Sequence, residues 1–120
     1  MTTTFTYANG SLQLQRWPLK QANASLQAWD AADELLIQHT LELAQQFIAE
    51  HQRAPRLLLI NDSFGALSCA LAQYPQVQVN DSVLAQHATL HNRRQNQLDG
   101  AGLQQQSSLA PYPQQPDIVL

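Results

Sequence analysis

Apolar and polar residues alternate in two short runs near the start of the chain. The runs cover residues 3–7 and 11–17, and an Asn9-Gly10 pair separates them. Alternation with a period of two is typical of β-strands, and Asn-Gly is a strong hairpin signal. Pro18 ends the second run, because proline cannot donate a hydrogen bond to a neighbouring strand. The pattern therefore predicts a β-hairpin and a linker over residues 1–24.

A helical period replaces this alternation in the next segment. An apolar stripe at helical spacing is formed by Trp29, Leu36, Leu43 and Phe47. Ser25 is a candidate N-cap, and acidic residues gather in the early turns, where they complement the helix dipole. Pro55 stops any further helix. We predict one long helix over residues 25–51.

Short apolar runs and helical segments then follow one another to the end of the chain. The predicted strands span residues 57–60, 76–79, 103–108 and 117–120, and the predicted helices span residues 64–74 and 82–98. This β-α-β-α-β-β order is typical of a parallel, right-handed, doubly wound sheet. We therefore predict an α/β, Rossmann-like domain over residues 25–120, with an open and mainly parallel sheet. Because the chain ends within an apolar strand, we expect the domain to be incomplete at its C-terminus.

Composition and charge narrow the classes of protein. The chain of 120 residues is long enough for one domain, and it has neither a secretory signal nor an apolar run that could span a bilayer. Its single cysteine, Cys69, excludes an internal disulfide and is expected to pack as a small buried hydrophobe. We expect a cytoplasmic protein without a membrane partner. The net charge of −3 argues against a surface that coats nucleic acid, so any RNA contact has to be local.

The loop after the first sheet strand lies where nucleotide sites begin in open α/β sheets. Asp62 and Asp81 end successive strands about 20 residues apart, which suits a second carboxylate on ribose hydroxyls. The loop has one glycine, Gly65, and Phe64 stands where a further glycine would let the backbone approach a ligand. These four residues are candidates for a degenerate cofactor site. The two aspartates are more simply interpreted as caps of the helices that follow them.

Two groups of residues are candidates for RNA contacts. Arg16, Trp17 and Lys20 combine cations with an aromatic ring that can stack on an unpaired base. Arg93 and Arg94 are adjacent near the end of a predicted helix, where they could contact phosphates. Structural explanations remain open for both groups, because the tryptophan can pack under the long helix and the arginines can complement a helix dipole.

Other chemistry has little support in the sequence. The chain has no Gly-x-Ser-x-Gly elbow and no Gly-Lys-Ser/Thr phosphate loop. His87 and His91 share a helix face, but no third ligand is evident, so the pair does not predict a zinc site. We predict neither a catalytic nor a metal-binding residue in this chain.

Several segments, in the same order, resemble the N-terminal domain of the ribosomal RNA large subunit methyltransferase G family, which is related to small subunit methyltransferase C. These segments are LQLQRWP, LQAWDAADELL, INDSFGALSCAL, the NDS of residues 80–82, and YPQQPDIVL, and the likeness spans roughly residues 10–120. Members of this family carry two tandem methyltransferase-like domains. The C-terminal domain binds S-adenosylmethionine and methylates N2 of a guanine in 23S rRNA.

The resemblance implies a non-catalytic domain that recognises RNA and stabilises the enzyme. Its implied partners are 23S rRNA and the C-terminal catalytic domain of the same protein. The catalytic Asn-Pro-Pro-Phe loop belongs to the C-terminal copy, and this sequence has no counterpart. S-adenosylmethionine is then the cofactor of the full-length enzyme, with none in this chain. Two alternatives stay open, namely a domain that itself binds S-adenosylmethionine and a structural scaffold for domain packing or dimerisation.

Overall fold

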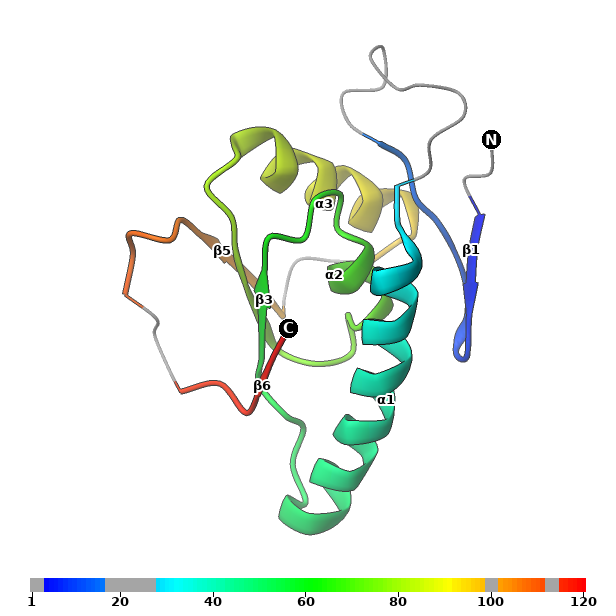
Figure 1. The fold of residues 1–120 in the computed structure, drawn as a ribbon, viewed down its shortest axis with the longest axis vertical. Coiled ribbons are helices and arrows are strands. Elements are labelled where there is room, and N and C mark those ends of the chain that lie inside the picture. Colours follow the sequence, from blue (N-terminus) through cyan, green and yellow to red (C-terminus); the bar gives the residue numbers. More distant parts are fainter. Residues whose placement is uncertain (1–3, 17–27, 99–101, 112–114) are drawn as a thin grey trace.

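Two separate sheets and three helices make up the part of the chain that this computed structural model describes, residues 4–16, 28–98, 102–111 and 115–120 (Figure 1). The helices are α1 (Ala31–His51), α2 (Ala66–Ala70) and α3 (Val83–Gln95). The smaller sheet is an antiparallel hairpin of β1 (Thr4–Tyr7) and β2 (Gly10–Gln13). The larger sheet contains β3 (Leu57–Ile60), β4 (Gln76–Val79), β5 (Leu103–Gln106) and β6 (Ile118–Val119), all parallel, in the order β5-β4-β3-β6. The predicted α/β content, N-terminal hairpin and parallel sheet are confirmed.

The hairpin packs against the start of the helical layer. Tyr7 pairs with Gly10, so Ala8-Asn9 forms a two-residue turn. Phe5 is buried on the inner face of the hairpin, and the centroid of its ring lies 5.2 Å from that of Trp29. This aromatic contact joins the hairpin to the segment that leads into α1.

Helix α1 begins later than the sequence pattern predicts. Residues 28–30 are not helical, and Asp30 is the N-cap. The Asp30 carboxylate accepts a hydrogen bond of 2.8 Å from the Asp33 N–H, and the Asp33 carboxylate accepts one of 3.0 Å from the Asp30 N–H. This reciprocal capping box fixes the start of the helix. The Ser25 cap and the boundary between residues 24 and 25 lie outside the described residues.

The two central strands, β3 and β4, form at residues 57–60 and 76–79, where the sequence predicts them. Each follows a proline, Pro55 or Pro75, which prevents the preceding helical segment from continuing. The outer strands are shorter than predicted, and so are the two later helices; α2 covers only five residues. The core strand β3 buries all three of its leucines, and Leu57 and Leu59 face the helices.

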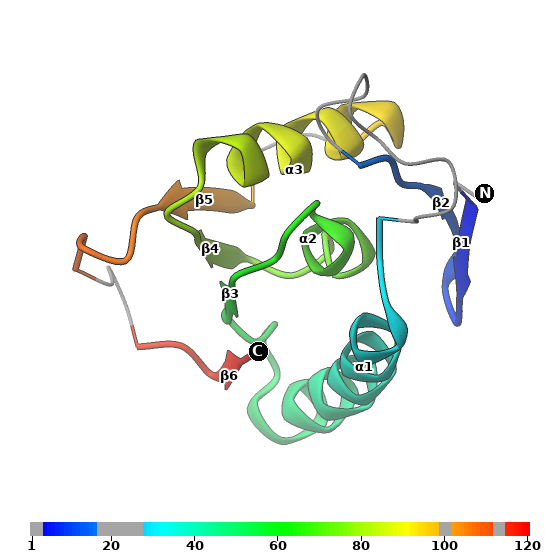
Figure 2. The ribbon, with the colours of Figure 1, turned by 45° about the horizontal axis from the view of Figure 1, so that its top comes forward.

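The helices α1, α2 and α3 lie on one side of the larger sheet (Figure 2). Gln76 and Gln78 point to this side, because they form hydrogen bonds to side chains of α2 and α3. Neighbouring strand positions face the other side. On that opposite face, where no helix of the described structure lies, Ile60 is 40% exposed and Val119 is 57% exposed.

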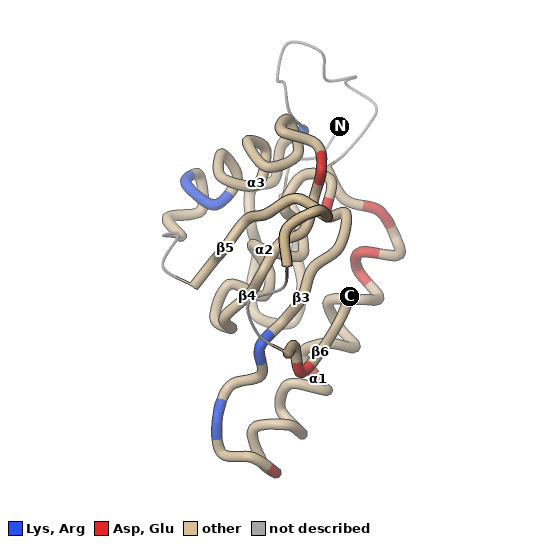
Figure 3. Tube along the Cα trace, turned by 90° about the vertical axis from the view of Figure 1, so that its left-hand side faces the viewer, with Lys and Arg blue, Asp and Glu red and all other residues tan. Residues whose placement is uncertain are grey.

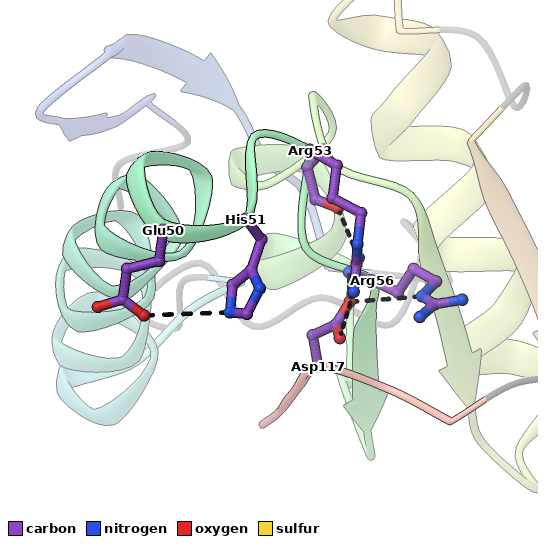
Figure 4. Close-up of polar contacts among 6 residues, drawn as sticks. Glu50, His51, Arg53, Arg56 and Asp117 are labelled. Carbon is purple, nitrogen blue, oxygen red and sulfur yellow. Dashed lines mark hydrogen bonds and ion pairs between the residues drawn. The ribbon is translucent and has the colours of Figure 1, made fainter.

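Strand β6 is attached to β3 by Asp117 at its start (Figure 4). The Asp117 carboxylate accepts hydrogen bonds from Arg53 Nη1 at 2.9 Å, Arg53 Nη2 at 3.2 Å and the Arg56 backbone N–H at 2.8 Å. Arg56 Nε lies 3.4 Å from the same carboxylate. The short β6 therefore depends on one side chain as well as on its ladder.

Candidate functional site

A cleft of about 370 Å³ lies at the carboxyl ends of β3 and β4, beside the start of α3. This is the edge at which open α/β sheets bind ligands. The residues that line the cleft are Asn61, Ser63, Phe64, Asn80, Ser82, Leu84 and Ala85. Of the four candidate cofactor residues, the structure therefore places only Phe64 in its wall.

Asp62 lies beneath the loop and not in the lining of the cleft. Its carboxylate is buried and accepts hydrogen bonds from the backbone N–H groups of Leu67 at 3.4 Å and Ser68 at 3.0 Å, and from Gln78 Nε2 at 3.4 Å. Burial raises the pKa of Asp62 to about 6, although these hydrogen bonds act in the opposite direction. Asp62 thus satisfies N–H groups in the first turn of α2.

Gly65 allows a close approach between the loop and α3. Its φ is +90°, in the region that favours glycine, and an added Cβ would lie 2.7 Å from Thr89 Cα. The loop is fastened on this side by Asn92 Nδ2, which donates to the Phe64 carbonyl at 2.8 Å. The single glycine of the loop is therefore required for internal packing.

Phe64 is half-buried, packs against the core and lines the cleft. The guanidinium of Arg16 lies over its ring, with Cζ 4.9 Å from the ring centroid. This cation–π contact holds a positive charge next to the cleft. The structure thus brings together one candidate cofactor residue and one candidate RNA-binding residue.

Asp81 is exposed, and its carboxylate is bonded to the loop that follows β5. It accepts from the Ser108 N–H at 2.8 Å and from Ser108 Oγ at 2.7 Å, and these bonds lower the pKa of Asp81. The prediction that Asp81 caps the next helix is wrong, because the N-cap of α3 is Ser82, whose Oγ accepts from the Ala85 N–H at 3.2 Å. The Ser82 hydroxyl, one position after Asp81, lies within reach of the free N–H groups at the start of α3, whereas the Asp81 carboxylate is turned to Ser108.

The two adjacent arginines of α3 have different environments. Arg93 is 3% exposed, and its Nη1 donates to Ser68 O at 3.1 Å and to Ser68 Oγ at 3.0 Å. The guanidinium of Arg93 is thus buried against α2 and cannot reach a phosphate at the surface. Arg93 is therefore not among the RNA contacts that we propose. Arg94 is exposed. Trp17 and Lys20 lie outside the described residues.

The sequence reasoning did not select the polar residues that line the cleft. Asn61 and Asn80 each directly follow a strand, at the sheet edge where ligands bind, and this position was the available signal. Within the described ranges, no group of three or more His, Cys, Asp or Glu side chains is placed to hold a metal ion. Nor does any helix in that part of the chain have the length and apolar character needed to cross a membrane.

Comparison with known proteins identifies the family. The RLMG N-terminal domain family matches residues 2–120. A relative from Cronobacter sakazakii (strain ATCC BAA-894), named ribosomal RNA large subunit methyltransferase G, is 45% identical over 112 residues. The alignment covers 93% of this chain but 27% of the relative, so the chain spans about a quarter of that protein's length. The resemblance found in the sequence is confirmed, and the chain belongs to the RLMG N-terminal domain family.

Proposed function

We propose that this chain is a non-catalytic, Rossmann-like domain that holds RNA and stabilises an S-adenosylmethionine-dependent 23S rRNA guanine-N2 methyltransferase. The proposal places the chemistry and the cofactor in a C-terminal domain of the same protein. The relative's name, which specifies methylation of large-subunit ribosomal RNA, supports rRNA as the partner.

The non-catalytic part of this proposal rests on Asp62 and Asp81, the two candidate carboxylates, because both already accept hydrogen bonds from the protein itself. A ribose at this sheet edge needs a carboxylate that can accept hydrogen bonds from its hydroxyls. Asp62 is buried under α2, and Asp81 accepts two hydrogen bonds from Ser108. The residues of the cleft therefore do not fit S-adenosylmethionine. In a calorimetric titration of the chain with S-adenosylmethionine we expect no binding heat, and micromolar binding would overturn the non-catalytic role.

The RNA-holding part rests on the cations that remain accessible. Figure 3 shows that the arginines of the described residues do not form one continuous stripe, so an RNA surface would be local. Arg94 is exposed on α3, and Arg16 lies next to the cleft. Together with Trp17 and Lys20, they are the candidate RNA contacts.

Salt-dependent binding tests these contacts. Fluorescence anisotropy with a 23S rRNA fragment at increasing KCl should give a linear fall of log affinity with log salt. The double variant Arg16→Ala/Arg94→Ala should reduce this slope by about 1.4 to 1.8, because each lost phosphate contact removes roughly 0.7 to 0.9.

Arg53→Ala is the charge-matched control, because Arg53 already pairs with Asp117 and lies at the amino end of the sheet strands. We expect it to leave the slope close to that of the wild type. An unchanged slope in the double variant would exclude the assigned contacts. If the wild type binds no RNA at any salt concentration, the RNA-holding role itself is wrong.

A further inference from the structure

The wall of the cleft contains an amide donor that has no partner among the described residues, Nδ2 of the largely buried Asn80. Asn80 is 8% exposed, and its Oδ1 accepts a hydrogen bond of 2.8 Å from the Ser82 N–H. This bond fixes the orientation of the carboxamide and leaves Nδ2 without a partner among the described residues. The same part of the chain has no fully buried side-chain nitrogen or oxygen that lacks a hydrogen bond. The Nδ2 group of Asn80 is therefore accessible from the cleft that Asn80 lines.

Two further polar side chains line the cleft with spare hydrogen-bonding capacity. The Asn61 carboxamide and the Ser63 hydroxyl are exposed, and neither has a protein partner in the described ranges. Asn61 is held with φ of 61°, while its backbone N–H donates to Val79 O at 3.0 Å. The rest of the lining includes apolar groups of Phe64 and Leu84. Donors, acceptors and apolar groups together suit a planar heterocycle with a polar edge.

The charge of the cleft distinguishes between possible ligands. No carboxylate lines it, since Asp62 and Asp81 are engaged elsewhere. A lining without a carboxylate gives no charge stabilisation to the sulfonium cation of S-adenosylmethionine and does not supply the acidic acceptor that ribose hydroxyls usually meet at this sheet edge. The guanidinium of Arg16, above Phe64, instead favours a ligand that carries phosphate.

We propose that this cleft binds an unpaired nucleobase of single-stranded RNA. Asn80 Nδ2 donates a hydrogen bond to an acceptor on the edge of the base, and Phe64 and Leu84 contact its faces. Arg16 contacts the phosphate next to that base. The volume of about 370 Å³ lies within the range of about 300–1,000 Å³ that is usual for small-molecule sites. This inference rests on the proposed RNA-holding function and assigns it a site.

The test compares base-dependent binding in the wild type and in Asn80→Asp. The substitution keeps an acceptor for the Ser82 N–H but replaces the donor with a negatively charged acceptor. The ligands are a single-stranded oligoribonucleotide and an abasic oligomer of equal length and charge, compared by anisotropy at one KCl concentration. We expect the wild type to prefer the base-bearing oligomer by about tenfold, and Asn80→Asp to lose this preference.

Two more variants test whether the effect of Asn80→Asp is specific to the cleft. Asn9→Asp makes the same chemical change at the exposed hairpin turn and should retain the preference. Leu84→Trp fills the cleft at a side chain that is 55% exposed, so the fold tolerates it, and the preference should again disappear. Thermal unfolding followed by circular dichroism confirms that each variant is folded.

Each other outcome has a distinct meaning. If the wild type binds both oligomers equally, RNA holding stands and the base site is overturned. If it binds neither, the proposed function and the base site both fail. If S-adenosylmethionine displaces the base-bearing oligomer, the cleft is a cofactor site and the inference is wrong.

Discussion

Asp62 combines a carboxylate with near-complete burial, and the hydrogen bonds that it accepts from N–H groups in the first turn of α2 explain how the protein accommodates it. Three hydrogen bonds reach its oxygens, yet desolvation dominates and raises the pKa to about 6 from the ordinary value of 3.8. The folded state therefore binds the proton more tightly than the unfolded state does. The resulting stabilisation is complete below pH 3.8 and is lost as the pH rises through about 6.

The variant Asp62→Asn should remove this pH dependence. Across pH 4 to 7 the free energy of unfolding of the wild type should fall relative to that of the variant by roughly 2 kcal/mol, since the pKa difference is about two units and part of the change lies below pH 4. Urea unfolding at several pH values measures the difference. Asp81→Asn is the control. Because the pKa of Asp81 is lowered in the folded state, its contribution to stability falls as the pH decreases, which is opposite to that of Asp62. Parallel curves for wild type and Asp62→Asn would contradict the assignment.

At the scale of elements, the attachment of β6 depends on the Asp117 carboxylate, whose partners Arg53 and Arg56 are far away in sequence. Arg53 and Arg56 hold the pKa of Asp117 well below its usual range, chiefly through the hydrogen bonds from Arg53. Because the folded-state pKa is lowered, this stabilisation is present above the ordinary pKa of an aspartate and is lost at lower pH. The attachment of β6 is therefore intact at neutral pH.

Asp117→Asn should loosen β6 without unfolding the rest of the sheet. The amides of Ile118 and Leu120, which donate to Arg56 O and Leu58 O, should exchange with deuterium about tenfold faster, because a lost charged hydrogen bond costs on the order of 1.5 kcal/mol. Hydrogen–deuterium exchange with mass spectrometry measures this change. Equal exchange rates in wild type and variant would mean that the backbone ladder alone holds β6.

The elements differ in how well the sequence predicted them. The central strands matched their predicted ranges because apolar runs bounded by prolines are local signals. The start of α1 did not match, because the acidic residues of the early turns were interpreted only as complementing the helix dipole, although two of them, Asp30 and Asp33, form the cap itself. The burial of Arg93 depends on its hydrogen bonds to Ser68, which is 25 residues away, so the sequence around Arg93 could not reveal it.

On the scale of the whole molecule, the parallel sheet has helices on one face only among the described residues. Parallel sheets are normally buried on both faces, and edge strands present unpaired backbone groups. Ile60 and Val119 are exposed on the face opposite the helices. This distribution favours association through the sheet at high concentration.

Val119→Lys should reduce such association, because a lysine on an edge strand opposes both apolar contact and strand pairing. Sedimentation velocity over a range of concentrations would show a smaller associated fraction than in the wild type. Val83→Lys changes an equally exposed valine on α3 and should leave association unaffected. A wild type that stays monomeric at the highest concentration would rule out this role for the sheet face.

The contact between Gly65 and α3 also limits how this fold could be redesigned. The absence of a Cβ at Gly65 brings the loop against the backbone of α3, at Thr89 Cα. Replacing Phe64 with glycine would enlarge the cleft, but the loop would still rest against the helix. An engineer who wished to install a cofactor in this domain would have to displace α3 before adding any new ligand-binding side chain.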